Sequence, residues 1–228
     1  MARRGFKNLA LLALRECPWL LKLIRPLGAR EHVMDAGGWD DEYRSGKWAY
    51  LAAISEDAHH QVVAGYAHAL KPNARLLDVG CGEGTLNAAL RRFGYRRYLG
   101  IDISPVAIAK AQRLADADTA FMASPGDAFA TDERFDVIVF NETLNYFADP
   151  AATVAKYGRF LAEDGIFVVS MAMVGIRDGL LKLDIWRAVE QSLHVIDEMA
   201  IYRPAGATWI VKALAEPATA NRLSAALI

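Results

Sequence analysis

Three glycines and an aspartate lie close together in the segment LLDVGCGEG. Gly80, Gly82 and Gly84 lack a Cβ, so the backbone there is able to turn tightly and come close to a ligand. A dinucleotide-binding fingerprint expects G-x-G-x-x-G, but the residue three positions after Gly82 is Thr85. Asp78, two residues before the first glycine, would also repel a pyrophosphate. The segment therefore favours a ligand that carries an amino group and disfavours a nicotinamide dinucleotide.

Two further acidic residues follow apolar runs later in the chain. Asp102 lies 18 residues after Gly84, and Asp127 follows a third apolar run. A carboxylate at the end of a second parallel strand is able to accept both hydroxyl protons of a ribose. One that follows the third strand is placed to accept from the exocyclic amine of adenine. Together the acids predict a crevice for a ligand with an amine, a ribose and a purine, the alternative at each position being an ordinary solvated aspartate.

Short apolar runs alternate with helical patterns around these residues, which predicts a parallel sheet with helices on both faces. The predicted strands are 75–79, 97–101, 119–123, 135–140 and 165–171. The predicted helices are 85–93, 105–115, 150–162 and 176–191, preceded by an apolar helical stripe over 47–70. Two late runs, 194–202 and 208–214, predict a terminal antiparallel hairpin. The polar, glycine-rich segment 31–46 is predicted to be a loop.

The composition is that of a globular protein, with 228 residues, 54% of them hydrophobic, and 26 basic against 27 acidic side chains. This balance gives no general attraction to nucleic acid. Two cysteines outside any CxxC pair predict a reduced, cytoplasmic setting. Residues 1–30 differ, because they carry seven basic residues and one acid. Their helical apolar spacing predicts a cap that packs on the domain, and the alternative is a basic amphipathic helix on a membrane surface.

Taken together, these segments resemble a known family, the class I S-adenosylmethionine (SAM)-dependent methyltransferases. LLDVGCGEG resembles the first motif of the family, GIDIS its acidic ribose-binding turn, and FDVIVFNETLNYFADP its fourth strand with the following loop. The resemblance implies an α/β fold, a Rossmann-like, doubly wound seven-stranded sheet in the order 3-2-1-4-5-7-6 with the last strand antiparallel. It implies an N-terminal helical lid over residues 1–72, a SAM-binding core over 73–215 and a C-terminal tail over 216–228.

The resemblance also implies which residues hold SAM and its product, S-adenosylhomocysteine (SAH). The glycines of the first motif would pass beneath the methionine portion, and Asp102 would hold the ribose. Asp127 with Ala128 would contact the adenine, Asn141 would lie near the sulfonium, and Tyr43 from the lid would hydrogen-bond the SAM carboxylate. The predicted cofactor-binding residues are Tyr43, Asp78, Gly80, Cys81, Gly82, Asp102, Ile103, Asp127, Ala128 and Asn141.

Methyl transfer from a sulfonium is an in-line displacement, so the protein must mainly position the reactants and exclude water. Glu142 at a predicted strand end is a candidate to orient an amine or accept a proton. His59 is a second catalytic candidate, with a buried core histidine as the alternative, whereas His60 lies off the apolar stripe and is expected to be solvated. Tyr146 and Trp186 are candidates for the walls of an acceptor pocket. No spacing is typical of metal ligands, so no metal is predicted.

We therefore expect a SAM-dependent methyltransferase that acts on an oxygen or nitrogen of a small molecule, such as a natural-product intermediate or a sugar. No nucleic-acid partner is expected, because no basic, aromatic-rich face lies outside residues 1–30. One alternative is a SAM-binding protein on the same fold that carries out a cyclisation or a rearrangement. Another is a lipid-linked acceptor at a membrane surface, reached through residues 1–30. The sequence does not indicate the oligomeric state.

Overall fold

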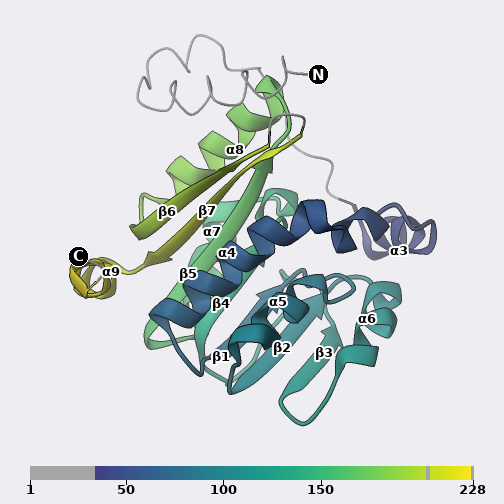
Figure 1. Ribbon diagram of the computed structural model, residues 1–228, viewed down its shortest axis with the longest axis horizontal. Helices are drawn as coiled ribbons and strands as arrows, with labels where there is room; N and C mark the ends of the chain where they lie inside the picture. Colours follow the sequence, from purple (N-terminus) through teal and green to yellow (C-terminus); the bar gives the residue numbers. More distant parts are fainter. Residues whose placement is uncertain (1–33, 204–205, 227–228) are drawn as a thin grey trace.

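The computed structural model describes residues 34–203 and 206–226, which form one sheet covered by helices on both faces (Figure 1). The strands are β1 (Arg75–Val79), β2 (Arg97–Asp102), β3 (Thr119–Ala123), β4 (Phe135–Asn141), β5 (Leu161–Met173), β6 (His194–Tyr202) and β7 (Thr208–Ala215). Their order is β3-β2-β1-β4-β5-β7-β6. The first five strands are parallel, and β7 is antiparallel to both β5 and β6. The predicted sheet order and the antiparallel last strand are confirmed.

Helices cover the sheet on both faces. They are α3 (Ala36–Arg44), α4 (Ile54–Leu70), α5 (Thr85–Phe93), α6 (Pro105–Ala111), α7 (Pro150–Gly158), α8 (Ile176–Val189) and α9 (Pro217–Ala226). Apolar side chains of α4, α5 and α6 form one core cluster with one face of the sheet, and those of α7 and α8 form a second cluster on the other face. Leu76 belongs to the first cluster and Leu77 to the second, because successive strand residues point to opposite faces.

Side-chain caps set where two of the helices begin. Ser104 caps α6 by accepting a hydrogen bond from the Ala107 amide at 3.1 Å, and Pro105 occupies the first helical position, as its fixed φ allows. Asp149 caps α7 in the same way, at 3.0 Å from the Ala152 amide. Both helices therefore start directly after a strand end or its loop, which leaves those loops at the carboxyl edge of the sheet.

The segment 31–46, predicted to be a loop, is helical over Ala36–Arg44, so that prediction is wrong for these residues. Asp35 caps the helix by accepting from the Gly38 amide at 2.9 Å, and Arg44 pairs with Asp40 one turn earlier. The cap and the ion pairs offset the low helix propensity of the two glycines. The apolar stripe from residue 47 is also divided, because a 3-10 turn (Ala49–Ala52) precedes α4.

The end of the chain also contains regular structure. The predicted C-terminal tail holds α9, where Ser224 donates to the Ile196 carbonyl at 3.2 Å. Both interpretations of residues 1–30 concern a segment outside the described residues. Among the helices that the structure describes, none is long and apolar enough to cross a membrane.

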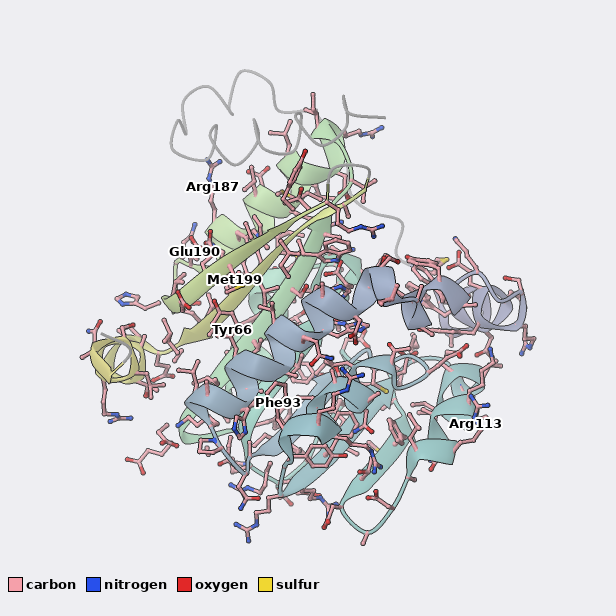
Figure 2. The ribbon with its side chains drawn as sticks, viewed as in Figure 1. Tyr66, Phe93, Arg113, Arg187, Glu190 and Met199 are labelled. Carbon is pink, nitrogen blue, oxygen red and sulfur yellow. The ribbon has the colours of Figure 1, made fainter. Side chains whose placement is uncertain are left out.

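Helix α4 connects the segment that contains α3 to the first strand of the sheet. In Figure 1 it runs diagonally in front of the sheet, from the region of α3 down to the lower left, where the chain turns into β1. Tyr66 of α4, labelled in Figure 2, donates a hydrogen bond from its hydroxyl to Asp197 of β6 at 2.9 Å. Because α4 contacts α5, β5, β6 and β7, its first turn is held firmly above the carboxyl ends of the strands.

Candidate functional site

A cavity of about 730 Å³ lies at the carboxyl ends of the parallel strands, beneath α3 and the first turns of α4. Ligands of open α/β sheets bind at this edge, because the loops that follow the strands meet there. One part of the lining comes from the ends of β1, β2 and β4 and from α3, which we call the lid from here on. The other part comes from α4, α8 and the connection between β6 and β7. We call these parts the cofactor half and the distal compartment.

The glycine turn after β1 forms the floor of the cofactor half. Gly80 and Gly82 have φ values of 76° and 55°, which few residues other than glycine adopt without strain. A Cβ on Gly80 would lie 2.8 Å from the Cβ of Thr143, and one on Gly82 would lie 2.8 Å from the hydroxyl oxygen of Tyr43. The turn thus lies directly under Tyr43 of the lid and leaves no room for side chains.

The carboxylate of Asp102 is fixed by two backbone amides. Its Oδ2 accepts from Gly82 N and its Oδ1 from Ser104 N, each at 2.9 Å. Burial raises the pKa of Asp102, and the two amides act against that rise. Asp102 and its neighbour Ile103 both line the cavity. The carboxylate is therefore pre-oriented at the end of β2 before any ligand arrives.

Two buried oxygens at the floor of the cavity have no donor among the described residues. Asp78 is 1% exposed, and its Oδ2 accepts from the Tyr98 hydroxyl at 2.6 Å, whereas its Oδ1 is unpaired. Burial raises the pKa of Asp78 to about 7. Asn141, at the end of β4, also lines the cavity and has an unpaired Oδ1. Buried acceptors without a donor are costly, so this floor is suited to a ligand that brings N–H groups.

The lid is fastened to α6 by three side chains, which we call the lid clasp. Asp40 accepts from the Ser104 hydroxyl and from the Val106 amide, the latter at 3.2 Å. The Ser104 hydrogen bond is the main reason that the pKa of Asp40 lies below its usual value. Lys110 donates to the Tyr43 carbonyl at 2.8 Å. The lid clasp, which consists of Asp40, Ser104 and Lys110, thus holds α3 over the glycine turn.

Glu142 follows β4 with a left-handed backbone, at φ 60°, an uncommon conformation for a residue other than glycine. Its Oε1 accepts from the Ser170 hydroxyl and its Oε2 from the Ala172 amide, each at 2.7 Å. Burial raises the pKa of Glu142, while the Ser170 hydrogen bond and the charge of Lys182 act against that rise. Glu142 lines the cavity, follows β4 of the cofactor half and interacts electrostatically with Lys182 and Glu56 of the distal compartment, so it lies between the two parts of the lining.

The distal compartment contains charged side chains that the sequence analysis did not select. Arg203 contacts Glu56 at 3.3 Å and lies over the ring of Trp209, 5.7 Å from its centroid. Lys182 of α8 contacts Asp178 at 2.8 Å. The residues missed by the sequence analysis are Glu56, Lys182, Arg203 and Trp209. A charged residue on a buried helix face is the signal that would have found Lys182, which is 6% exposed.

Two of the histidines of α4, His59 and His60, are both buried, which agrees with the core alternative for His59 and not with the prediction for His60. His59 is buried and stacks on Trp209 at 5.0 Å, but it does not line the cavity. His60, expected to be solvated, is 4% exposed and lines the cavity, so that expectation is wrong. The reason is that α4 packs against the sheet on one side and lines the cavity on another, so the His60 side of the helix is also shielded from solvent. Burial lowers the pKa of His60 to about 4, which makes it neutral at pH 7.

The other predicted residues divide into those that line the cavity and those that do not. Asp127 and Tyr146 line it, as does Cys81, a buried thiol that packs beside Gly100. Ala128 is exposed and is not part of the lining. Trp186 lies in the core cluster beneath α8 and forms no wall of the cavity. In the part of the chain that the structure describes, no group of three or more potential ligands could hold a metal ion.

The chain is similar to methyltransferases in sequence. Among curated proteins, it is 31% identical over 155 residues to a ubiquinone biosynthesis O-methyltransferase of Azorhizobium caulinodans, over 62% of this chain and 60% of that protein. It is 29% identical over 136 residues to a ribosomal protein L11 methyltransferase of Thermosipho africanus, over 56% of this chain and 50% of that protein. The chain therefore spans 50–60% of the length of these two relatives.

The fold is also found in solved structures. The N-methyltransferase NodS from Bradyrhizobium japonicum WM9, in complex with SAH, matches with a TM-score of 0.61 and 18% identity, over 75% of this chain and 91% of that chain. A family model described as a methyltransferase domain matches residues 44–205, well over half of the 228 residues. The chain therefore belongs to the methyltransferase domain family, and it shares its fold with this N-methyltransferase.

Proposed function

We propose that the protein transfers the methyl group of SAM to an oxygen or nitrogen of a small molecule. The observation that carries the proposal is that one cavity is lined both by the residues of the cofactor half and by those of the distal compartment. Its volume of about 730 Å³ lies within the range of small-molecule sites. Methyl transfer needs both reactants in one enclosed space, with the acceptor in line with the methyl group.

The cofactor half fits SAM on three structural observations. Asp102 is pre-oriented to accept from the two ribose hydroxyls. The unpaired Oδ1 of Asp78 suits the environment of an ammonium group. The glycine turn lines the cavity with bare backbone and approaches Tyr43 and Thr143 so closely that a Cβ on Gly82 or Gly80 would clash with them. When bound, SAM supplies the electrophilic methyl group.

The residues of this chain would then position the acceptor and exclude water. Helix α3, held by the lid clasp, covers the cavity, and Glu142 lies between the two parts of its lining. Glu142 is placed to hold the acceptor atom or to take up its proton. A small acceptor is favoured over a folded protein because the lid encloses the space. The buried free thiol of Cys81 agrees with a reducing, cytoplasmic setting.

Calorimetric titration of the purified chain with SAH, with NAD as a control ligand, tests the cofactor assignment. We expect micromolar binding of SAH and none of NAD. A folded protein that binds NAD and ignores SAH would contradict the proposal. Incubation with SAM and candidate acceptors, followed by measurement of the SAH formed, separates methyl transfer from the alternative of a cyclisation or rearrangement, in which SAM is not consumed.

A further inference from the structure

The lining of the cavity is strongly acidic. Among the described residues, it contains seven acidic side chains against three basic ones. The acids are Glu56, Asp78, Glu83, Asp102, Asp127, Glu142 and Asp149, and the bases are Lys156, Lys182 and Arg203. Low-dielectric walls strengthen the field of such an excess of one sign. The cavity as a whole is therefore complementary to cationic or proton-donating ligands.

The positive charges of the distal compartment are each paired with an acid. Arg203 is paired with Glu56, and Lys182 with Asp178. Lys182 also lowers the pKa of Glu142 through its charge, so it already serves two carboxylates. An acceptor that carries a carboxylate or a phosphate would have to compete with these acids for both cations. An acceptor without a carboxylate or a phosphate does not face this competition.

The end of β4 offers hydrogen-bond acceptors to the reacting atom. The Thr143 hydroxyl donates to the Val79 carbonyl at 2.7 Å, which fixes the residues after β4 beside the glycine turn. Asn141 and Glu142 thus lie next to the expected position of the SAM sulfur, and both line the cavity. Asn141 has an unpaired Oδ1, and Glu142 is held in a left-handed backbone by Ser170 and Ala172. Such groups bind N–H donors and stabilise a cation.

We propose that the methyl acceptor is an amine and that Glu142, with Asn141, holds its nitrogen at the end of β4. This inference rests on the proposed function. The lone pair of the neutral amine forms a bond to the methyl carbon, and the carbon–sulfur bond breaks with its electron pair going to sulfur. The sulfur becomes a neutral thioether, and the nitrogen gains the positive charge. Glu142 stabilises that charge, and the ammonium product then loses one proton to solvent or leaves protonated.

An oxygen acceptor fits the same groups less well. A hydroxyl must lose its proton before or during the transfer, so negative charge develops on oxygen. A base must take up that proton, but both oxygens of Glu142 already accept hydrogen bonds, from the Ser170 hydroxyl and the Ala172 amide. An amine develops charge of the opposite sign at the same place, so the same groups lower its barrier.

Sinefungin tests the inference, because this SAM analogue carries a primary amine where SAM carries the transferred methyl group. Its dissociation constant and that of SAH are to be measured by calorimetry at pH 7.5. For the unmodified chain, we expect sinefungin to bind at least about tenfold more tightly than SAH, since its ammonium would contact Glu142 and Asn141. In Glu142→Gln, we expect this ratio to fall about fivefold or more while SAH affinity stays within about twofold.

Asp127→Asn is the matched control, because it also converts a lining carboxylate to an amide but lies at the cofactor end. We expect it to change the affinities for sinefungin and SAH equally and to leave their ratio unaltered. Retained SAH binding shows that each variant is folded. Sinefungin binding no tighter than SAH, or a ratio unaffected by Glu142→Gln, would overturn the amine assignment and leave the methyltransferase proposal standing. Absence of SAH binding by the folded chain would instead overturn the proposed function.

Discussion

The two parts of the cavity are built in different ways. The floor of the cofactor half comes from the ends of three adjacent parallel strands, β1, β2 and β4, where backbone amides orient the key carboxylate of Asp102. The distal compartment is assembled from α4, α8 and the connection between β6 and β7, and its groups are held by side-chain pairs such as Glu56 with Arg203.

Because of this difference, substitutions should disturb the groups of the cofactor half more than those of the distal compartment. Backbone amides and glycine turns cannot be altered by a substitution without a change in the path of the chain. Side-chain ion pairs on separate elements can be exchanged one at a time, because each pair contributes little to stability where it is partly exposed. We therefore expect substitutions in the cofactor half to affect SAH binding strongly and substitutions in the distal compartment to affect it weakly.

The largest effect is expected for Gly80→Ala. The new Cβ would lie 2.8 Å from the Cβ of Thr143, and the residue would keep a φ of 76°. We expect SAH affinity to fall by about 100-fold or more and the free energy of unfolding by about 2–4 kcal/mol. Calorimetry and urea denaturation measure the two quantities.

Gly46→Ala is the control for backbone strain. Gly46 has nearly the same φ, 74°, but beyond its two chain neighbours no atom of the described residues lies within 4 Å of its added Cβ. We expect a loss of only about 1 kcal/mol in unfolding free energy and no change in SAH affinity. Equal effects of the two substitutions would show that the close approach at Gly80 has no role of its own.

Asp102→Ala is expected to have the next largest effect. It removes the charge-assisted hydrogen bonds to the ribose and leaves the amides of Gly82 and Ser104 without their acceptor. We expect SAH binding to weaken by about 1–3 kcal/mol, as measured by calorimetry. Unchanged affinity in a folded variant would remove Asp102 from the ribose site.

Asp78→Asn tests whether the buried carboxyl group of Asp78 lowers the free energy of unfolding at neutral and higher pH. The pKa of Asp78 is about 7 in the folded chain, above its ordinary value of 3.8. The folded state therefore holds a proton that the unfolded state releases between these values, and stability falls as the pH rises through that window. We expect the variant to be about 1–3 kcal/mol more stable than the unmodified chain at pH 8 and equally stable near pH 4.

Urea denaturation at the two pH values measures the effect of Asp78→Asn, with SAH titration at pH 8 alongside. We expect weaker SAH binding despite the higher stability, because an amide does not stabilise an ammonium as a carboxylate does. If the difference in unfolding free energy between the variant and the unmodified chain were the same at pH 8 and pH 4, that result would contradict the raised pKa of Asp78.

The smallest effect on the cofactor is expected for Arg203→Gln, in the distal compartment. The change removes the ion pair with Glu56 and the cation over Trp209. Because the Arg203 side chain is 39% exposed, we expect a loss of less than about 1 kcal/mol in unfolding free energy and SAH affinity within about twofold. A tenfold loss of SAH affinity, measured by calorimetry, would show that the two parts of the cavity are not separable.

The same contrast explains how much the sequence predicted. The sheet order and the strands follow from apolar runs and turn residues, so β1 and β3 were predicted with the bounds that the structure shows. Asp78 was selected by its place two residues before the first glycine, Asp102 by its place at the end of the second predicted strand, and Asn141 by the resemblance to the family. These are properties of short, contiguous segments, which sequence patterns describe well.

The distal compartment depends on contacts between segments far apart in the chain, and these have no local pattern. Glu56 and Arg203 lie 147 residues apart and meet only because α4 packs across β7. His60 was expected to be solvated because a single apolar stripe was assigned to α4, whereas the helix is covered on two sides. The helix α3 was missed because Gly37 and Gly38 are typical of loops and the Asp35 cap depends on geometry.

The lid clasp has a consequence for the residence time of the product. Ser104 donates its hydroxyl proton to Asp40 of the lid, and its backbone amide donates to Asp102 beneath the expected ribose position. Withdrawal of α3 must break the first of these bonds at the same residue that supports the second. If SAH occupies the site as proposed, its release and the opening of the lid are linked through Ser104, and we expect the dissociation rate of SAH to report how often the lid detaches.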